Sequence, residues 1–296
     1  MMNNKRKICF IINPISGIGR QKTIEKLVAD FLDTSAFEPS LFYTEGPKHA
    51  TTLAKKAASE NYSIVVAVGG DGSVNEVASG LIGTTSALGI LPAGSGNGLA
   101  RHLGIPMDLE KALQIIQKGR TQAIDSIQFN DHYFVNVAGI GFDAHIGWEF
   151  SQFGKRGFSS YIKVIMKELS ALKTNRFELK IDEQQAIQKD AYLISFANGS
   201  QWGNNAYIAP LADIKDGVLD IVIIKKFPLL FGLPLVLKLF TRKIHTSSAV
   251  EIIKAKKVIV TQEKKIAHID GEPIESGQTI TISINPLSLN VIAPLS

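Results

Sequence analysis

The chain has 296 residues, of which 45% are hydrophobic and 20% charged, and its formal net charge is +5 at pH 7. This composition excludes a disordered or fibrous protein, and the length suits two domains, or one large one, around a real hydrophobic core. One cysteine excludes an internal disulfide, and Cys9 is expected to be a core residue of a reduced, intracellular protein. The positive charge favours anionic partners, but its scattered distribution does not predict a nucleic-acid partner.

The first third of the chain alternates short apolar runs with segments of helical periodicity. The run at 64–68 is apolar throughout, as in a central parallel strand that is covered on both faces. This alternation predicts a parallel, doubly wound α/β sheet. Strands are predicted at residues 7–12, 41–44, 64–68 and 88–91, and helices at residues 24–32, 49–60, 74–81 and 109–116.

The pattern changes after about Arg120. Residues 129–134 are predicted to form a hairpin with an Asn–Asp turn, and apolar residues then alternate with polar ones. This half of the chain is expected to be a mainly antiparallel β domain. Further strands are predicted at residues 177–181, 192–197, 219–224, 258–261 and 280–284, and helical segments near 161–172 and 229–240.

Neither a signal peptide nor a transmembrane helix is predicted. The apolar run after the basic N-terminus is too short for a signal-peptide core. The longest apolar stretch, at 227–237, is well short of the roughly 20 residues that a spanning helix needs. We therefore expect a cytoplasmic protein.

Three glycine-rich turns follow predicted strands of the first domain. Ligands of open parallel sheets bind at the carboxyl ends of strands, and glycines let backbone N–H groups approach a phosphate. Any one turn could equally be a plain strand-to-helix connection, but three together indicate a nucleotide site. The turns are Asn13-Pro14-Ile15-Ser16-Gly17, Gly69-Gly70-Asp71-Gly72-Ser73-Val74-Asn75-Glu76 and Pro92-Ala93-Gly94-Ser95-Gly96-Asn97-Gly98.

Asp71 stands out in these turns, because a carboxylate repels phosphate unless a cation lies between them. Its simplest role is to hold Mg²⁺ against the nucleotide, directly or through water. The chain has neither the Lys-Ser/Thr pair of a P-loop nor a GxGxxG sequence, so neither a P-loop enzyme nor a standard dinucleotide fold fits.

Six motifs, spread over essentially the whole chain, together resemble the diacylglycerol kinase catalytic family, which includes bacterial lipid kinases and sphingosine kinases. They are Asn13-Pro14-x-Ser16-Gly17, Gly69-Gly70-Asp71-Gly72-Ser73-x-Asn75-Glu76-Val77-x-x-Gly80-Leu81, Leu91-Pro92-Ala93-Gly94-Ser95-Gly96-Asn97, Val137-Ala138-Gly139-x-Gly141-Phe142-Asp143, Asp216-Gly217-x-Leu219-Asp220 and Asp270-Gly271-Glu272.

The resemblance implies a lipid kinase that uses ATP and Mg²⁺ in a cleft between two domains. The first is a three-layer α/β domain at 1–122, with a C-terminal return at 287–296, and the second a lipid-binding β-sandwich at 123–286. The implied ATP-site residues are Asn13, Pro14, Ile15, Ser16, Gly17, Thr44, Gly69, Gly70, Asp71, Gly72, Ser73, Val74, Asn75, Gly94, Ser95 and Asn97.

Acidic residues of the second half also receive roles from the resemblance. Glu272 resembles the family's proton acceptor, with Asp270 beside it, whereas the residues alone favour a solvated turn. Asp125 resembles an aspartate that joins the network of Asp71 and Mg²⁺, although a turn or a cap would also explain it. A second Mg²⁺ is implied at the Asp216 carboxylate with the carbonyl oxygens of Asp213 and Val218, with a type I turn as the alternative.

The substrate lipid stays open between diacylglycerol and a sphingoid base. Ser73 and Ser95 stand where many diacylglycerol kinases have threonine, and Gly98 where several bacterial ones have aspartate. The third turn is closer to sphingosine kinases. The rival interpretations are an NAD kinase and a catalytically silent lipid or nucleotide sensor, and a homodimer is allowed.

A kinase of lipids must meet its substrate at a membrane, so a peripheral, transient membrane contact is expected. The apolar stretch 227–240, which basic residues flank, could dock on an anionic bilayer. The alternative is that this stretch packs on the β domain.

Overall fold

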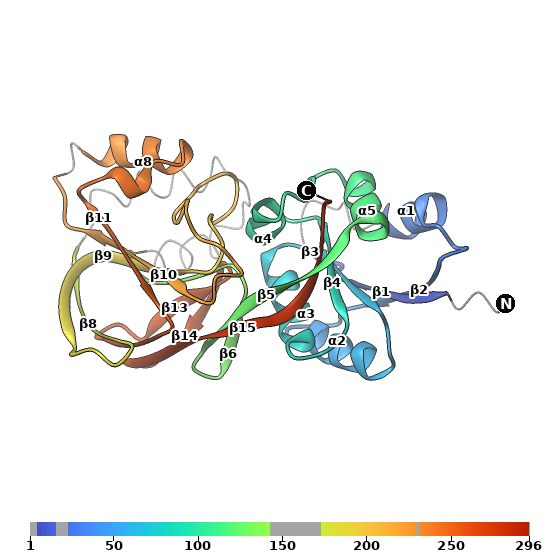
Figure 1. Cartoon of the computed structure of the whole chain (residues 1–296), viewed down its shortest axis with the longest axis horizontal. Helices are drawn as coiled ribbons and strands as arrows, with labels where there is room; N and C mark the ends of the chain where they lie inside the picture. Colours follow the sequence, from blue (N-terminus) through green and yellow to red (C-terminus); the bar gives the residue numbers. More distant parts are fainter. Residues whose placement is uncertain (1–4, 16–22, 143–172, 229–230, 296) are drawn as a thin grey trace. The chain divides into compact units, whose positions relative to one another are not determined.

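The computed structural model describes residues 5–15, 23–142, 173–228 and 231–295, and the helix expected near 161–172 lies outside them (Figure 1). The chain forms two compact units. The first consists of residues 1–124 and 287–296, and the second of residues 125–286.

The sheet of the first unit has the strand order β4-β3-β1-β2, and these strands run parallel. Ile12 lies opposite both Tyr43 and Val68, and Gly69 lies opposite Pro92. The carboxyl ends of the four strands therefore line one edge. The bounds are β1 (Arg6–Ile12), β2 (Phe37–Tyr43), β3 (Ile64–Gly69) and β4 (Ala87–Pro92).

Helices cover both faces of this sheet, which confirms the three-layer α/β fold. Figure 1 shows α1 and α5 on one face of the strands and α2 and α3 on the other. Ile24, Val28 and Leu32 form the buried face of the first helix and its C-cap, whereas Phe31 is 46% exposed. The bounds are α1 (Ile24–Phe31), α2 (His49–Ser59), α3 (Asp71–Leu81), α4 (Gly98–His102) and α5 (Leu109–Lys118).

The second unit is built from antiparallel strands, as expected. Phe129 lies opposite His132, so the predicted Asn–Asp hairpin is confirmed. β15 pairs antiparallel with β12 and, further along, parallel with β4, so it runs from the second unit into the first. The bounds are β5 (Arg120–Phe129), β6 (His132–Phe134), β7 (Val137–Gly141), β8 (Asn175–Ile181), β9 (Ile187–Ala197), β10 (Leu219–Lys225), β11 (Val250–Ala255), β12 (Lys257–Gln262), β13 (Ile266–Ile269), β14 (Glu272–Glu275) and β15 (Thr279–Ala293), with α8 (Gly232–Phe240) and the 3₁₀ turn η4 (Ile244–Thr246).

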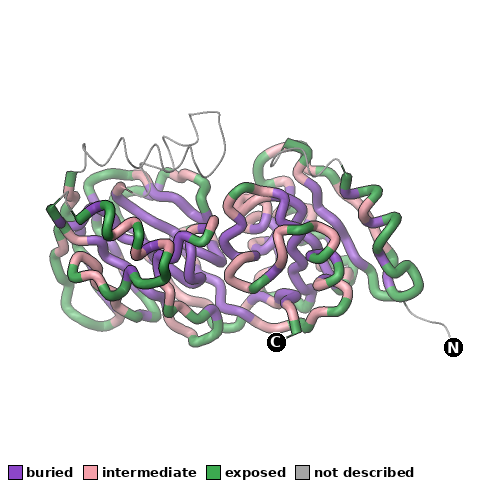
Figure 2. The backbone as a smooth tube through the Cα atoms, turned by 90° about the horizontal axis from the view of Figure 1, so that it is seen from above, coloured by how far each residue is buried: buried purple, intermediate pink, exposed green. Residues whose placement is uncertain are grey.

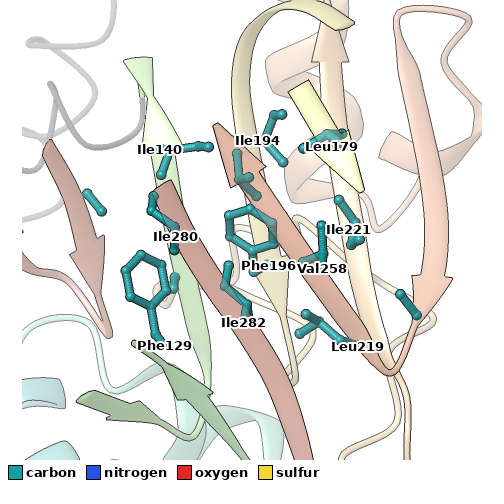
Figure 3. Close-up of a cluster of buried hydrophobic side chains, with 14 of the residues drawn as sticks. Phe129, Ile140, Leu179, Ile194, Phe196, Leu219, Ile221, Val258, Ile280 and Ile282 are labelled. Carbon is teal, nitrogen blue, oxygen red and sulfur yellow. The ribbon is translucent and has the colours of Figure 1, made fainter. Parts of the chain in front are cut away.

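Two apolar clusters hold this unit, one on each face of β10. The side chains of Leu219, Ile221 and Ile223 enter the central cluster, part of which Figure 3 shows. Those of Val222 and Ile224 enter the other, which includes residues of α8 and η4. β10 is therefore covered on both faces, and Figure 2 shows that buried segments run through the interior of each unit. Within the described residues, no helix is long and apolar enough to cross a membrane.

Candidate nucleotide site and acidic loops

The first two glycine turns meet at the carboxyl edge of the parallel sheet. Asn13 follows β1, and its side-chain Nδ2 donates a hydrogen bond to Ser73 Oγ in α3 at 3.4 Å. Its Oδ1 accepts the N–H of Ile15 at 3.0 Å, which fixes the turn. Ser16 and Gly17 lie outside the described residues. Thr44 follows β2 at the same edge, and its N–H donates to the carbonyl of Ile12.

The second and third turns pack backbone against backbone. The N–H groups of Ala93 and Gly94 both donate to the carbonyl of Gly69, at 2.9 and 3.1 Å. A Cβ added at Gly94 would lie 2.4 Å from Gly70 Cα, a distance that real Cβ atoms do not adopt. Glycine is therefore required here for a close approach, and not only for flexibility.

Asp71 connects the third turn to the start of α3. Its Oδ2 accepts the N–H of Asn97 at 2.8 Å, and its Oδ1 accepts the N–H of Gly98 at 2.6 Å. Asn97 is the N-cap of α4 in the left-handed conformation, with φ 52°, and its Nδ2 donates to the carbonyl of Gly94. The cation-binding role of Asp71 stays a prediction, and the structure shows that its carboxylate also holds the third turn in place.

The turns have the donors and acceptors that a nucleotide with Mg²⁺ requires. Each oxygen of Asp71 has more than one lone pair, so accepting a backbone N–H leaves capacity for a cation or its water. The buried Oδ1 of Asn97 has no hydrogen-bond donor among the described residues, so it is an acceptor that a ligand or water could use. The residues present therefore fit the expected group.

The remaining predicted residues of these turns have different surroundings. Gly70 is the N-cap of α3, so Gly72, Ser73 and Asn75 lie in its first turns. The side chain of Val74 is buried, and only its backbone could contribute to binding. Ser95 lies in the connection between β4 and α4, next to Gly94.

Glu76 and Arg101, which were not assigned a role from the sequence, stabilise the backbone around this site. Glu76 accepts the N–H groups of Lys48 and Ala50, at 2.9 and 3.1 Å, so it caps the N-terminus of α2 with a negative charge. Arg101 Nε donates to the carbonyl of Gly96 at 3.0 Å. Glu76 belongs to the second motif, but its partners lie 26 and 28 residues away along the chain, so no local pattern predicts them.

The two carboxylates of the Asp270-Gly271-Glu272 motif have contrasting surroundings. Asp270 and Gly271 form a two-residue turn with positive φ values between β13 and β14. The buried Asp270 carboxylate accepts three backbone N–H groups at 2.9–3.1 Å, those of Val135, Asn136 and Val137. Glu272 is exposed. A solvated turn is therefore a correct description of Glu272 but not of Asp270.

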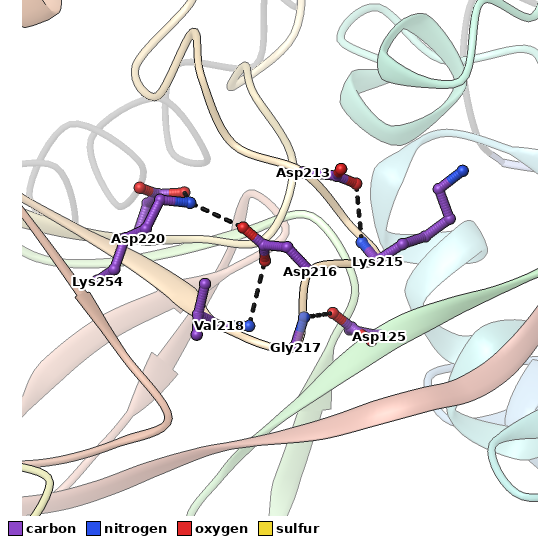
Figure 4. A network of polar contacts seen from close by, with 8 residues as sticks. All are labelled: Asp125, Asp213, Lys215, Asp216, Gly217, Val218, Asp220 and Lys254. Atoms are coloured by element: carbon purple, nitrogen blue, oxygen red, sulfur yellow. Dashed lines mark hydrogen bonds and ion pairs between the residues drawn. The ribbon is translucent and has the colours of Figure 1, made fainter.

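Asp125 holds the loop at 213–218 (Figure 4). It is fully buried, its Oδ2 accepts the N–H of Gly217 at 2.9 Å, and its own N–H donates to the carbonyl of Ile214 at 2.7 Å. The loop begins with a β-turn in which the Asp216 nitrogen lies 3.4 Å from the Asp213 carbonyl oxygen, so the turn alternative describes this segment. A role for Asp125 in a network with Asp71 stays a prediction.

Lys254 of β11 places its positive charge beside this loop and pairs with Asp216 and Asp220. Its Nζ lies 2.8 Å from Asp216 Oδ2 and 3.5 Å from Asp220 Oδ2. Burial raises the pKa of Asp220, and Lys254 opposes that rise. Burial lowers the pKa of Lys254, but the hydrogen bond to Asp216 and the negative charges of Asp220 and Asp216 outweigh burial. The pKa of Lys254 is therefore raised overall.

The surroundings of Asp216 therefore do not fit a second Mg²⁺ well. Asp216 Oδ2 lies 2.8 Å from Lys254 Nζ, whose positive charge would repel a second cation at this oxygen, and Oδ1 accepts the N–H of Val218 at 3.2 Å. The residues that the structure describes contain no group of three or more His, Cys, Asp or Glu able to hold a metal ion. The ligand set of Asp213, Asp216 and Val218 stays a prediction.

Comparisons with known proteins identify both units. Residues 7–129 match the diacylglycerol kinase catalytic domain, and residues 136–293 match the YegS C-terminal NAD kinase beta sandwich-like domain. The fold and the glycine turns thus define a two-domain protein of the diacylglycerol kinase type. The chain belongs to the YegS-like family of such proteins.

Curated relatives align with most of the chain. The chain is 34% identical over 255 residues to a probable YegS-like lipid kinase of Cronobacter sakazakii, covering 83% of each chain. It is 36% identical over 238 residues to the one of Citrobacter koseri, covering 78% of each. A putative diacylglycerol kinase from Bacillus anthracis has a similar fold, with a TM-score of 0.80 at 22% identity over 97% of this chain and 95% of that one. An NAD kinase from Archaeoglobus fulgidus is less similar, with a TM-score of 0.53 at 15% identity over 96% and 93%.

Proposed function

We propose that this chain is an ATP-dependent lipid kinase that transfers the γ-phosphate to a hydroxyl group of a lipid. One observation carries the proposal: three glycine turns are joined at the carboxyl edge of a parallel sheet. Asn13 bonds the first turn to Ser73, and Asp71 with the Gly70–Gly94 contact joins the second turn to the third. Membership of the YegS-like family, whose curated relatives are named probable lipid kinases, supports it.

The glycine turns would bind the phosphates through backbone N–H groups, and the first turn of α3 adds the favourable end of a helix dipole. Asp71 would hold Mg²⁺, which when bound neutralises phosphate charge. The catalytic chemistry is in-line displacement. A lipid hydroxyl oxygen forms a bond to the γ-phosphorus, the bond from this phosphorus to the β–γ bridging oxygen breaks, and ADP leaves.

The hydroxyl proton must go to a base as the new bond forms. The carboxylate of Glu272 is proposed to accept it, and its exposure leaves it open to a substrate. Asp270 is proposed to position Glu272, because its three N–H partners fix the turn from which β14 starts. Asp270 is thus a positioning residue in this scheme.

The test is labelled-phosphate transfer from ATP and Mg²⁺ to diacylglycerol, monoacylglycerol, phosphatidylglycerol, ceramide and sphingoid bases in mixed micelles. We expect transfer to one lipid class, and a loss of at least about 100-fold in Glu272→Gln, since general-base catalysis contributes 10²–10⁴-fold. Glu272→Gln keeps the size of the side chain, and because Glu272 is exposed the fold should be retained. Transfer to NAD alone would instead support an NAD kinase, and ATP binding without turnover a sensor.

A further inference from the structure

Helix α8 presents large apolar side chains to solvent. Phe231 is 56% exposed, Leu233 61% and Leu237 57%, and the three fall within seven consecutive residues. The helix of a soluble domain normally turns polar residues outward. A cluster of exposed apolar side chains on one short element marks a surface for a partner or a membrane.

The chain around this helix carries only positive charge. Between Lys225 and Ser248 the sequence contains four lysines, an arginine and a histidine but no aspartate or glutamate. Lys226 and Lys243, on either side of α8, are exposed. An apolar surface with uncompensated cations at its rim is complementary to the interface of an anionic bilayer.

The inner side of α8 is anchored to the second unit, so its outer side is held in place. Leu239 is buried in the cluster on the outer face of β10, and its carbonyl accepts the N–H of Tyr207 at 2.9 Å. The Arg242 guanidinium lies 4.2 Å over the Tyr207 ring. Lys238 Nζ donates to the Thr246 carbonyl at 3.1 Å, which joins α8 to η4. The alternative that this stretch packs on the β domain is thus correct for one side of the helix only.

We propose that the α8 face, formed by Phe231, Leu233 and Leu237 with Lys226 and Lys243, docks the protein on a bilayer that contains anionic lipids. The proposal rests on the proposed function, because it places a lipid kinase where its substrate resides. A second copy of the chain is the less favourable occupant, since two α8 faces would bring like charges together. The apolar side chains enter the acyl boundary while the lysines meet lipid phosphates.

The first test is co-sedimentation of the full chain, without ATP, with vesicles of phosphatidylglycerol and with vesicles of phosphatidylcholine. Wild type is expected to bind the anionic vesicles more tightly. Lys226→Gln with Lys243→Gln should weaken this binding roughly 30-fold, since each lysine near an anionic surface contributes about a fivefold factor. The matched control is Lys264→Gln with Lys265→Gln, which removes two exposed charges from the loop between β12 and β13 and should leave binding unchanged.

The apolar part is tested by Leu233→Ser with Leu237→Ser, which should weaken binding to the anionic vesicles at least tenfold. Both side chains are exposed, so the fold should be retained. Ile187→Ser, at the start of β9, is the control for an exposed apolar side chain elsewhere. Equal binding of wild type and both α8 variants would overturn the proposal. So would a leucine variant that turns a wild-type dimer into a monomer without changing vesicle binding.

Phosphate transfer to a short-chain lipid dissolved as monomers separates this proposal from the kinase proposal. We expect the α8 variants to phosphorylate the dissolved lipid at the wild-type rate and to lose transfer to lipid in vesicles. Vesicle binding without any transfer would reject the kinase and support the docking face. Transfer to vesicles at the wild-type rate by both α8 variants would reject the docking face and support the kinase.

Discussion

Asp71 and Asp270 stand in motifs that point to chemistry, yet each carboxylate accepts backbone N–H groups from another segment of its own unit. Hydrogen bonds to a charged acceptor are among the stronger ones in proteins. A carboxylate in such a position therefore stabilises the loop geometry whether or not it also takes part in a reaction. Mutational loss of activity at either residue needs a stability measurement beside it.

Asp270→Asn should destabilise the second unit by about 2–3 kcal/mol. Asparagine keeps the volume but replaces one acceptor oxygen with an NH₂ group, which would face a backbone N–H donor. Urea unfolding measures the change, and Glu272→Gln is the exposed neighbour that should shift stability by less than about 0.5 kcal/mol. If Asp270→Asn unfolds at the wild-type urea concentration while losing activity, a direct catalytic role would replace the positioning role.

Lys254→Met tests which cation the loop at 213–218 uses. It removes the partner of Asp216 and of the buried Asp220, so we expect a loss of about 1 kcal/mol, the upper end for a partly exposed pair. Thermal unfolding with Mg²⁺ and with EDTA is the measurement. Mg²⁺ should raise the melting temperature of the variant, and EDTA should leave that of the wild type unchanged. A wild-type melting temperature that falls in EDTA, and no longer does in Asp216→Asn, would support the metal prediction.

Cys9 should make the first unit less stable at alkaline pH. Burial, with a smaller effect of Glu60, raises the pKa of its thiol from 9.0 to about 12. Above pH 9 the unfolded thiol loses its proton while the folded one keeps it, so stability falls by about 1.4 kcal/mol per pH unit until the folded pKa is reached. Urea unfolding of wild type and Cys9→Ala between pH 8 and about 11 checks this, and a constant difference between the two would contradict it.

At the scale of elements, the contact between the second and third glycine turns depends on the absence of a side chain. Gly94→Ala would place a methyl group 2.4 Å from Gly70 Cα, and both sides of the contact are backbone, which cannot rotate away. We expect a loss of at least about 2 kcal/mol and weaker ATP binding, because the turns must separate. Isothermal titration with ATP and urea unfolding measure the two effects. Gly46→Ala is the control, since its added Cβ would meet nothing within 4 Å; equal ATP affinity in the two variants would contradict the prediction.

Elements with strong periodicity could be predicted from the sequence, and those fixed by tertiary contacts could not. β3 was predicted from its continuous apolar run, because a central strand that helices cover on both faces is apolar throughout. β2 begins at Phe37, earlier than predicted, because an edge strand tolerates Pro39, which lacks an N–H group. β11 is mostly half-exposed and shows no alternation, so it was missed.

The candidate site shows the same division. That the three turns meet follows from the parallel order of the strands, and it was predicted. The five residues of α4 were missed, because this helix contains a glycine and starts where Asp71 accepts the N–H groups of Asn97 and Gly98. Lys254 was not singled out either, since the strand pairing of β10 with β11 is what brings it near Asp220. A contact between segments that far apart has no periodic signal in one sequence.

At the scale of the whole molecule, the first unit is discontinuous in sequence. Its last strand segment comes from residues 287–296, where Leu289, Val291 and Ile292 are buried. Val291 lies opposite Leu88 of β4 in a parallel pairing. The stability of the first 124 residues therefore depends on a segment that follows the second unit in the sequence.

Leu289→Ala should destabilise the first unit by about 2–5 kcal/mol, the range for a large-to-small change at a fully buried site. Two probes can report on the units separately. Cys9 is buried in β1, so its reaction with the thiol reagent DTNB marks opening of the first unit, and both tryptophans fall within residues 125–286, so their fluorescence follows the second. With Trp148 replaced by Phe, the fluorescence is that of Trp202 alone. In a urea series, the Cys9 reaction should begin at a clearly lower concentration in the variant, while the Trp202 fluorescence transition should move much less. Leu295→Ala, at a side chain that is 69% exposed, should move neither. Equal shifts of both probes in Leu289→Ala would mean that β15 couples the two units into one cooperative transition, because this strand pairs with both β12 and β4.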